Sequence, residues 1–516
     1  MVPVNKKAGL VPPDGGWGWM VVLGVALTNT FNQSLLSLFG LLFGDKLTDM
    51  GQGTVGAAWV ANIMLLVFNF SGLVTGPALK TFSARTVTII GSLLAGGGMI
   101  AASFSTSVWH LIVTYSVFTG LGIGLIQPST FVAVNSYFRA KRGRAVGVSM
   151  AGTGVGQMLM PHLVRYLLDS YGFRGTALIL GALAFNGIVG AALFQPVEWH
   201  MLPDRKAESE KLRLLPEKKS GPLLYTNMTI ENDDKLQKRR SSMIQPPTFF
   251  EDISMSLPCS LETLTNNEKA KSVDRFKRSQ SYCYSSSLDS NENEKELPPA
   301  EVNAKSQGIW NKVKRLLDLD LLLDFTFINI IFSCGLVFTS NQNFNMLFPF
   351  YLQQQIGFDR EQTAMCMSAM AATDIIGRVT IPSFTDKYKV SSRVTFLFGC
   401  LTLILSRQVL CLQYNYIAVI MASGLCGFFR STIVVNQNLV VSEYCKEDES
   451  KLPAALGLNM VMKGISIISI GQLLGWIRDY TGSYYLCIYA QNSLLGVIVA
   501  LWTPELVYKY VKDKKR

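Results

Sequence analysis

The sequence predicts an all-α membrane protein with twelve transmembrane helices arranged in two six-helix halves. The chain has 516 residues, of which 49% are apolar and only 16% are charged, whereas a soluble protein carries about 25% charged residues. Mostly apolar runs long enough to cross a bilayer, ~20 residues each, occur in two batches. A long polar segment separates the two batches.

The twelve runs and their flanks divide the chain into five predicted parts. The first batch consists of runs 17–42, 55–79, 86–105, 109–135, 145–168 and 173–195. The second batch consists of runs 322–349, 362–384, 393–412, 414–441, 454–477 and 483–503. We therefore expect a cytosolic N-terminus (1–16), an N-terminal bundle (17–195), a linker (196–320), a C-terminal bundle (321–503) and a basic tail (504–516).

The linker and the loop charges predict the orientation. Residues 196–320 are rich in Lys, Glu, Ser, Asn and Pro, which is typical of a disordered segment. Positive residues between the runs fall on one side of the membrane, and this bias marks the cytosol. They are Lys6, Lys7, Lys80, Arg85, Arg139, Lys141, Arg142, Arg144, Lys387, Lys389, Arg393 and the tail 509–516. Both termini are therefore predicted to be cytosolic.

The two batches also resemble one another, which predicts an internal repeat. Five residues of the first half recur in the second half, each displaced by 310 positions: Ala145, Gly147, Met150, Asp169 and Gly172 become Ala455, Gly457, Met460, Asp479 and Gly482. Two similar six-helix halves joined by a long linker are the architecture of the major facilitator superfamily. In that fold the substrate site lies between the halves, and rocking of the halves alternates its access.

Several function classes are disfavoured by composition. The net charge of +11 is spread over loops, linker and tail, whereas a nucleic-acid binder clusters its basic residues on a folded surface. The three histidines and nine cysteines show no metal-ligand spacing, and no nucleophile and base pair stands out. We expect no nucleic-acid partner, no metal or other cofactor, and no enzyme activity.

Short motifs in both halves resemble one known family. The string Pro-Pro-Asp-Gly-Gly-Trp-Gly-Trp-Met-Val-Val at 12–22 is similar to the first-helix signature of the monocarboxylate transporter family, solute carrier family 16. The resemblance continues at Trp59 with Ile63-Met64-Leu65, at 137–142, and at Gly147 with 150–152. It also includes the Asp-x-x-x-Arg pair at 374–378. The likeness covers both halves and not the linker.

The resemblance implies a plasma-membrane carrier, often proton-coupled, for small monocarboxylates such as lactate or pyruvate. Other members of the family carry aromatic amino acids, thyroid hormones, creatine or carnitine, so membership alone does not identify the substrate. Members often travel with a single-span immunoglobulin-type chaperone, which we note as an implied partner alongside membrane lipid. The basic cluster at 139–144 is more typical of orientation signals and intracellular gate contacts than of a binding site, so we predict that Lys141 and Arg142 are gate contacts.

Charged residues inside the predicted helices are the strongest site candidates, because a charge at the bilayer centre costs several kcal/mol unless it faces a partner or a cavity. Asp374 and Arg378 lie four residues apart and therefore on one helix face. In one interpretation Arg378 binds a substrate carboxylate through two parallel hydrogen bonds, and Asp374 exchanges the coupled proton. In the other, the two residues form a structural ion pair.

Two further positive residues, Arg430 and Lys463, fall in the middle of the tenth and eleventh runs. Together with Arg378 they outnumber the one buried acid, which favours an anionic substrate. A snorkelling or paired side chain is an equal alternative for each of them. Lys463 also departs from the resemblance, because the proton-coupled lactate carriers have an acid there. Arg407 lies near the outer end of its run, and we expect it to snorkel.

The first helix departs from the resemblance as well. Ser37 stands where the lactate carriers have a lysine, Gln33 where they have a tyrosine, and Asn438 where they have a phenylalanine. These three positions, with Met64, Leu65 and Phe68 of the second run, complete the predicted substrate-binding set. Polar side chains on the first helix could bind a substrate or line a helix interface equally well.

The sequence therefore predicts a secondary transporter of small monocarboxylates or related organic acids, working by alternating access, and leaves proton coupling open. One alternative is a proton-independent uniporter for amino-acid-like, aromatic or zwitterionic substrates. An alternative of another class is a receptor that senses a ligand without transporting it.

Overall fold

The computed structural model describes residues 10–51, 54–203, 314 and 316–515 of the chain. Almost all of these residues are helical, and the only strands among them are β1 (Leu10–Val11) and β2 (Leu202–Pro203), which pair antiparallel. The predicted all-α fold class is confirmed. Most of the predicted linker, 204–313 with 315, lies outside the described residues.

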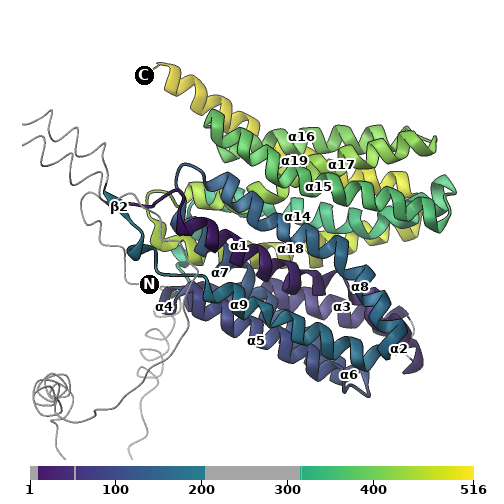
Figure 1. Ribbon diagram of the computed structural model, residues 1–516. Coiled ribbons are helices and arrows are strands. Elements are labelled where there is room, and N and C mark those ends of the chain that lie inside the picture. Colours follow the sequence, from purple (N-terminus) through teal and green to yellow (C-terminus); the bar gives the residue numbers. More distant parts are fainter. Residues whose placement is uncertain (1–9, 52–53, 204–313, 315, 516) are drawn as a thin grey trace, which may run out of the picture. The chain divides into compact units, whose positions relative to one another are not determined.

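The helices follow the two predicted batches (Figure 1). The first half contains α1 (Trp17–Asn32), η1 (Gln33–Leu36), α2 (Phe39–Asp49), α3 (Thr54–Phe70), α4 (Gly72–Thr81), α5 (Ala84–Ala102), α6 (Val108–Leu111), η2 (Ile112–Thr119), α7 (Gly120–Tyr137), α8 (Arg142–Ala184), α9 (Asn186–Ala192) and η3 (Val197–Trp199). The second half contains η4 (Leu319–Leu323), α14 (Phe325–Phe350), η5 (Tyr351–Ile356), α15 (Arg360–Tyr388), α16 (Ser392–Cys411), α17 (Tyr416–Tyr444), η6 (Glu449–Lys451), α18 (Leu452–Thr481) and α19 (Tyr484–Lys515).

Nine helices within the described ranges are long and apolar enough to cross a membrane. One of them, Arg142–Ala192, corresponds to two predicted runs, because its backbone leaves the helical conformation at Gly172. The first and seventh predicted runs are not among the nine. The helix α1 ends after 16 residues, where η1 begins, and α14 contains four asparagines, Asn329, Asn341, Asn343 and Asn345. The predicted count of twelve spans is therefore not confirmed by this criterion.

Local sequence signals explain where individual helices begin. Before α15, Gly357 takes a left-handed conformation with φ of 87°, which favours glycine. Asp359 then caps the helix: its carboxylate accepts a hydrogen bond from the backbone N–H of Gln362, and the Gln362 side chain accepts one from the backbone N–H of Asp359. This reciprocal capping box satisfies two N–H groups that have no partner within the helix.

The repeated residues occupy equivalent places in the two halves. Gly172 and Gly482 both have positive φ, 63° and 64°. Gly147 on α8 packs against the carbonyl oxygen of Arg378 on α15, and Gly457 on α18 packs against the carbonyl oxygen of Gly72 on α4. A Cβ at either position would overlap that oxygen. Glycine therefore allows one helix of each half to touch a helix of the other half backbone to backbone.

Regular structure extends a few residues into both ends of the predicted linker. Its first residues form η3 and β2, and β2 pairs with β1 near the N-terminus. At its far end Asp318 forms an ion pair with Lys80, which lies in the last turn of α4. The two ends of the linker are thus attached to the first half by different contacts.

Candidate functional site

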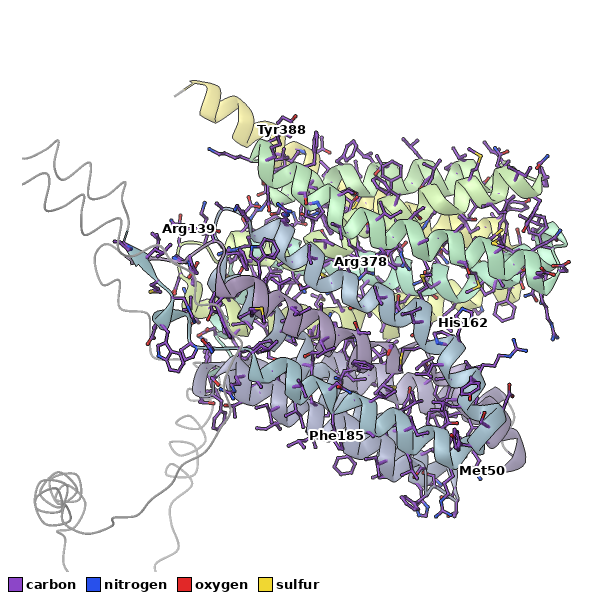
Figure 2. The ribbon with its side chains drawn as sticks, in the orientation of Figure 1. Met50, Arg139, His162, Phe185, Arg378 and Tyr388 are labelled. Carbon is purple, nitrogen blue, oxygen red and sulfur yellow. The ribbon has the colours of Figure 1, made fainter. Side chains whose placement is uncertain are left out.

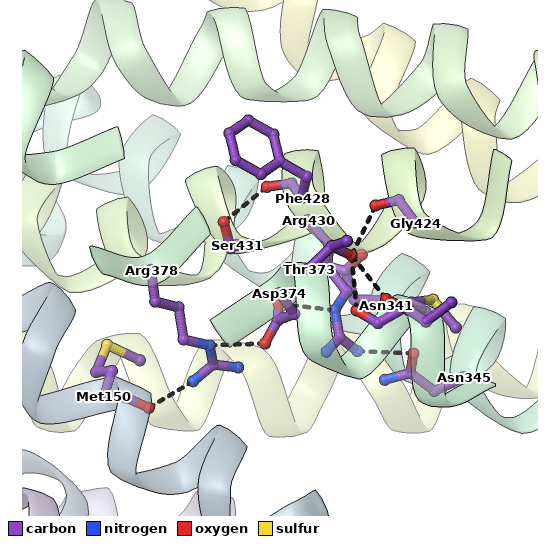
Figure 3. A network of polar contacts seen from close by, with 12 residues as sticks. Met150, Asn341, Asn345, Thr373, Asp374, Arg378, Gly424, Phe428, Arg430 and Ser431 are labelled. Carbon is purple, nitrogen blue, oxygen red and sulfur yellow. Dashed lines mark hydrogen bonds and ion pairs between the residues drawn. The ribbon is translucent and has the colours of Figure 1, made fainter. Parts of the chain in front are cut away.

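A charged cluster in the second half brings together three of the predicted site residues (Figure 3). The Asp374 carboxylate on α15 accepts hydrogen bonds from two guanidiniums, one through each oxygen. Arg378 Nε lies 2.7 Å from Oδ2, and Arg430 Nε on α17 lies 3.2 Å from Oδ1. Arg378 therefore forms the predicted i, i+4 pair, and Arg430 completes a cluster with one net positive charge.

The cluster also connects the two halves. Arg378 Nη1 donates to the carbonyl oxygen of Met150 on α8 at 2.9 Å. This contact is possible because Gly147, one turn earlier on α8, lets that helix approach α15 closely. Arg430 Nη1 donates to Asn345 Oδ1 on α14, also at 2.9 Å. In Figure 2, Arg378 lies between the end of the bundle marked by Arg139 and the end marked by Met50.

The cluster retains hydrogen-bond donors for a ligand. Asp374 and Arg378 are almost fully buried, whereas the Arg430 side chain keeps 13% of its surface exposed. The Nη2 groups of both arginines have no hydrogen-bond partner in the part of the chain that the structure describes. A carboxylate can accept from such paired N–H groups.

Lys463 is separate from this cluster. It is 4% exposed, and its ammonium nitrogen lies 5.8 Å from the ring centroid of Phe338 on α14. No acidic side chain of the described ranges forms an ion pair with it. The structure therefore buries Lys463 in the second half without a counter-charge among the described residues.

The remaining polar candidates make no contact with the charged cluster. The Ser37 hydroxyl is exposed and donates to the Ser34 carbonyl oxygen within its own turn. Gln33 lies at the junction of α1 and η1, and Asn438 lies on α17; both are half-buried. Neither side chain has a hydrogen bond to another described residue.

The apolar candidates on α3 belong to the core of the first half. Met64 and Phe68 are buried in its main apolar cluster, and Leu65 packs against that cluster. Gly120 on α7 lies against the Met64 backbone. These contacts show a packing role for the three side chains.

The two predicted gate residues differ in their contacts. Lys141 is exposed. Arg142 crosses to the second half, where Nη1 donates to Ser442 Oγ at 2.8 Å and Nη2 lies 3.5 Å from Glu449 Oε1. The Ser442 hydroxyl lies 2.8 Å from Asn135 Oδ1 on α7 and donates to it. Arg142 therefore joins the start of α8 in the first half to Ser442 and Glu449 in the second half.

Two carboxylates that the sequence analysis did not select hold the start of α8. Asp14 Oδ1 accepts from the backbone N–H groups of Arg139, Ala140 and Lys141 at 2.7 to 3.2 Å. From the other half, Asp386 Oδ2 accepts from the backbone N–H of Arg144 at 2.6 Å. Negative groups stabilise a helix N-terminus, so both acids stabilise the start of α8. Asp386 also joins this helix start to the second half.

The expectation that Arg407 snorkels is wrong. Its exposed fraction is 0%, and its guanidinium donates to Ser340 Oγ at 2.8 Å and Asn341 Oδ1 at 2.9 Å. It also lies 4.3 Å above the Phe344 ring. The helix α16 is apolar on most of its surface, so sequence alone could not show that this residue faces α14 rather than the membrane edge.

The fold and the buried charges define a polytopic membrane carrier, and the chain belongs to the Major Facilitator Superfamily, whose family model matches residues 19–261 and 330–516. It is 23% identical to monocarboxylate transporter 12-B of Danio rerio over 100% of this chain and 93% of that protein. It is 26% identical to monocarboxylate transporter 14 of Mus musculus over 97% of this chain and 93% of that protein. It is 34% identical to monocarboxylate transporter 4 of Gallus gallus over 40% of this chain and 43% of that protein.

These relatives confirm the predicted resemblance to the monocarboxylate transporter family. All of them are named transporters. The chain is accordingly a secondary transporter of the Major Facilitator type and a multi-pass membrane protein, not an enzyme.

Proposed function

We propose that this chain carries a small monocarboxylate or a related organic acid across the membrane by alternating access. The observation that carries the proposal is the Asp374 cluster, in which two buried guanidiniums share one carboxylate. The surplus positive charge has no counter-ion among the described residues, and burying an unpaired charge is costly. A substrate carboxylate removes that cost when it binds.

The contacts of Asp374 support a role in proton coupling. While ionised, its two oxygens occupy the Nε–H groups of Arg378 and Arg430. A proton on the carboxylate weakens both bonds and frees the guanidiniums for the incoming carboxylate. Arg378 also donates to the carbonyl oxygen of Met150 in the other half. Protonation of Asp374 therefore changes the contacts of a side chain at the interface between the halves, which moves in alternating access.

The same charge balance weighs against a zwitterionic substrate. A substrate ammonium needs an acidic partner, and Asp374, the one buried acid in the described part of the chain, is already shared by two arginines. The relatives named as transporters weigh against a receptor that does not transport.

The membrane context completes the proposal. We place the protein in the plasma membrane with both termini cytosolic, as the positive loops favour. Arg142 and Lys141 then lie at the intracellular gate. A single-span chaperone is a further partner of the proposed carrier.

Uptake in expressing cells tests the proposal. We expect labelled lactate or pyruvate to accumulate more than creatine or an aromatic amino acid, and more at acidic than at neutral external pH. Arg378→Lys keeps the charge but loses the guanidinium fork, so it should abolish uptake at normal surface expression. Arg360→Lys, an exposed arginine at the start of the same helix, is the matched control. Unchanged uptake by Arg378→Lys would assign that arginine a structural role instead.

A further inference from the structure

Two residues on one face of α18 form a second polar site away from the arginines. Asn459 and Lys463 are four residues apart, so their side chains lie one above the other on that helix. Asn459 is 1% exposed, and both its side-chain oxygen and its nitrogen lack a hydrogen-bond partner. Lys463 is 4% exposed and has no ion pair with any described residue. Buried polar groups are normally paired, so Asn459 and Lys463 have hydrogen-bonding capacity that a ligand can use.

The helix α14 relates this site to the arginine cluster. Lys463 lies against Phe338, and Arg430 donates to Asn345. Phe338 and Asn345 are seven residues apart, which places them on nearly the same helix face, roughly 10 Å apart along the axis. Gln342 falls between them on that face and is half-buried. The two cationic sites therefore contact the same face of α14.

The two sites together carry more positive charge than one carboxylate neutralises. Arg378, Arg430 and Lys463 supply three positive charges, and Asp374 supplies one negative charge. Phe338 and Asn345, the α14 residues that Lys463 and Arg430 contact, are roughly 10 Å apart along the helix axis. If two carboxylate groups bind with that spacing through hydrogen bonds of about 2.8 Å at each end, roughly 5 Å remains between them. That is the span of a dicarboxylate with a chain of four or five carbons.

We propose that the preferred substrate is a small dicarboxylate. One carboxylate binds the Nη2 groups of Arg378 and Arg430, and the other binds Lys463, with Asn459 donating to it through Nδ2. This inference rests on the proposed function, since it assigns a second anchoring point to the same transported organic acid. Lys463 is then the residue that sets specificity between singly and doubly charged acids.

Competition during uptake tests the inference. Full-length protein is reconstituted in liposomes and assayed with labelled succinate, with unlabelled succinate, glutarate, butyrate and valerate as competitors. We expect each dicarboxylate to compete better than the monocarboxylate of equal chain length by about tenfold or more, the factor that one charge-assisted hydrogen bond supplies. Lys463→Met keeps an unbranched side chain of nearly the same length and removes its charge, so it should erase that advantage while butyrate competes as before. Lys387→Met, an exposed lysine on α15, should leave the advantage intact.

The failures of the two proposals are distinguishable. Uptake of labelled lactate or butyrate together with equal competition by mono- and dicarboxylates would overturn the dicarboxylate inference and leave the organic-acid function standing. Absence of uptake for every acid would overturn both. If Lys463→Met does not fold, the thermal stability of the wild-type protein in succinate and in butyrate decides the question, because only the preferred ligand raises it strongly.

Discussion

The two halves of the molecule share a helical plan but differ in the chemistry of their interiors. Within the described residues, the buried polar groups of the first half are all neutral, whereas the second half buries Asp374, Arg378, Arg407 and Lys463. An internal repeat thus supports two different tasks. The first half supplies surfaces for packing, and in the proposed function the second half supplies the charges that select a substrate.

The polar residues of α1 illustrate the task of the first half. Asn29 donates to the Ser149 carbonyl oxygen at 3.3 Å, and Thr30 donates to the Gly152 carbonyl oxygen at 3.0 Å. Both contacts bind α1 to the backbone of α8. Of the two interpretations offered by the sequence, a helix interface is the one these contacts favour for Asn29 and Thr30.

Removing the carboxylate that Arg378 and Arg430 share should give the largest loss of stability and uptake. Asp374→Asn leaves two guanidiniums without their acceptor charge, and loss of one partner of a buried ion pair costs about 3–5 kcal/mol. We expect loss of uptake and a clearly lower unfolding temperature for the purified protein. Glu447→Gln, an exposed carboxylate, is the control. Wild-type stability in Asp374→Asn would show that water or lipid already compensates the cluster.

The glycines at the interface between the halves should give the next largest effect. Gly147→Ala and Gly457→Ala each place a Cβ against a carbonyl oxygen of the opposite half, and overpacking of this kind costs about 1–3 kcal/mol. We expect both variants to transport more slowly. We also expect a cysteine introduced beside the substituted glycine, at the interface between the halves, to be labelled more readily by a thiol reagent. Gly97→Ala is the control, because nothing lies within 4 Å of its Cβ. Equal labelling in all three variants would contradict a tight interface.

Substituting Arg407 should distinguish a buried arginine with a structural role from one that binds the substrate. Arg407→Leu leaves Ser340 and Asn341 without a donor, which costs about 1–3 kcal/mol. We expect fewer molecules at the cell surface, while those that arrive show an unchanged KM. Arg430→Leu should instead raise KM. A raised KM in Arg407→Leu would extend the substrate site into the bundle interior.

The smallest effect is expected in the first half, where the buried polar groups are neutral. Thr30→Val keeps the shape of the side chain and removes one hydroxyl that binds Gly152. We expect a loss of about 1 kcal/mol or less, with uptake unchanged, as measured by thermal unfolding and transport of the same preparation. A large loss of uptake would mean that α1 takes a direct part in binding.

The fold and part of the site could be predicted from the sequence for clear physical reasons. Long apolar runs and the repeated glycines follow from local composition, and the Asp374–Arg378 pair follows from helical spacing. Arg430 reaches the same carboxylate from another helix, 56 positions later, and only tertiary packing decides such a meeting.

The errors have equally local causes. Counting from the first-helix signature places Ser37 in the substrate site, and this stays a prediction; α1 ends at Asn32 and η1 follows, so helical spacing alone does not fix which way Ser37 faces. Arg407 was misjudged because distance from a helix end does not tell which neighbour a side chain meets. The roles of Asp14 and Asp386 depend on a loop and a helix that are distant in the sequence.

The Asp386 contact has a consequence for the speed of the carrier. The Asp386 carboxylate of the second half accepts from the backbone N–H of Arg144 in the first turn of α8, so separation of the halves at this end removes that hydrogen bond, while the contacts of Asp14 remain. A capping group is worth about 1 kcal/mol, and solvent must replace it during each cycle. Breaking this hydrogen bond therefore adds to the free-energy barrier for separating the halves. We expect Asp386→Asn to lower that barrier, so that the closed state becomes less stable and the transport rate rises.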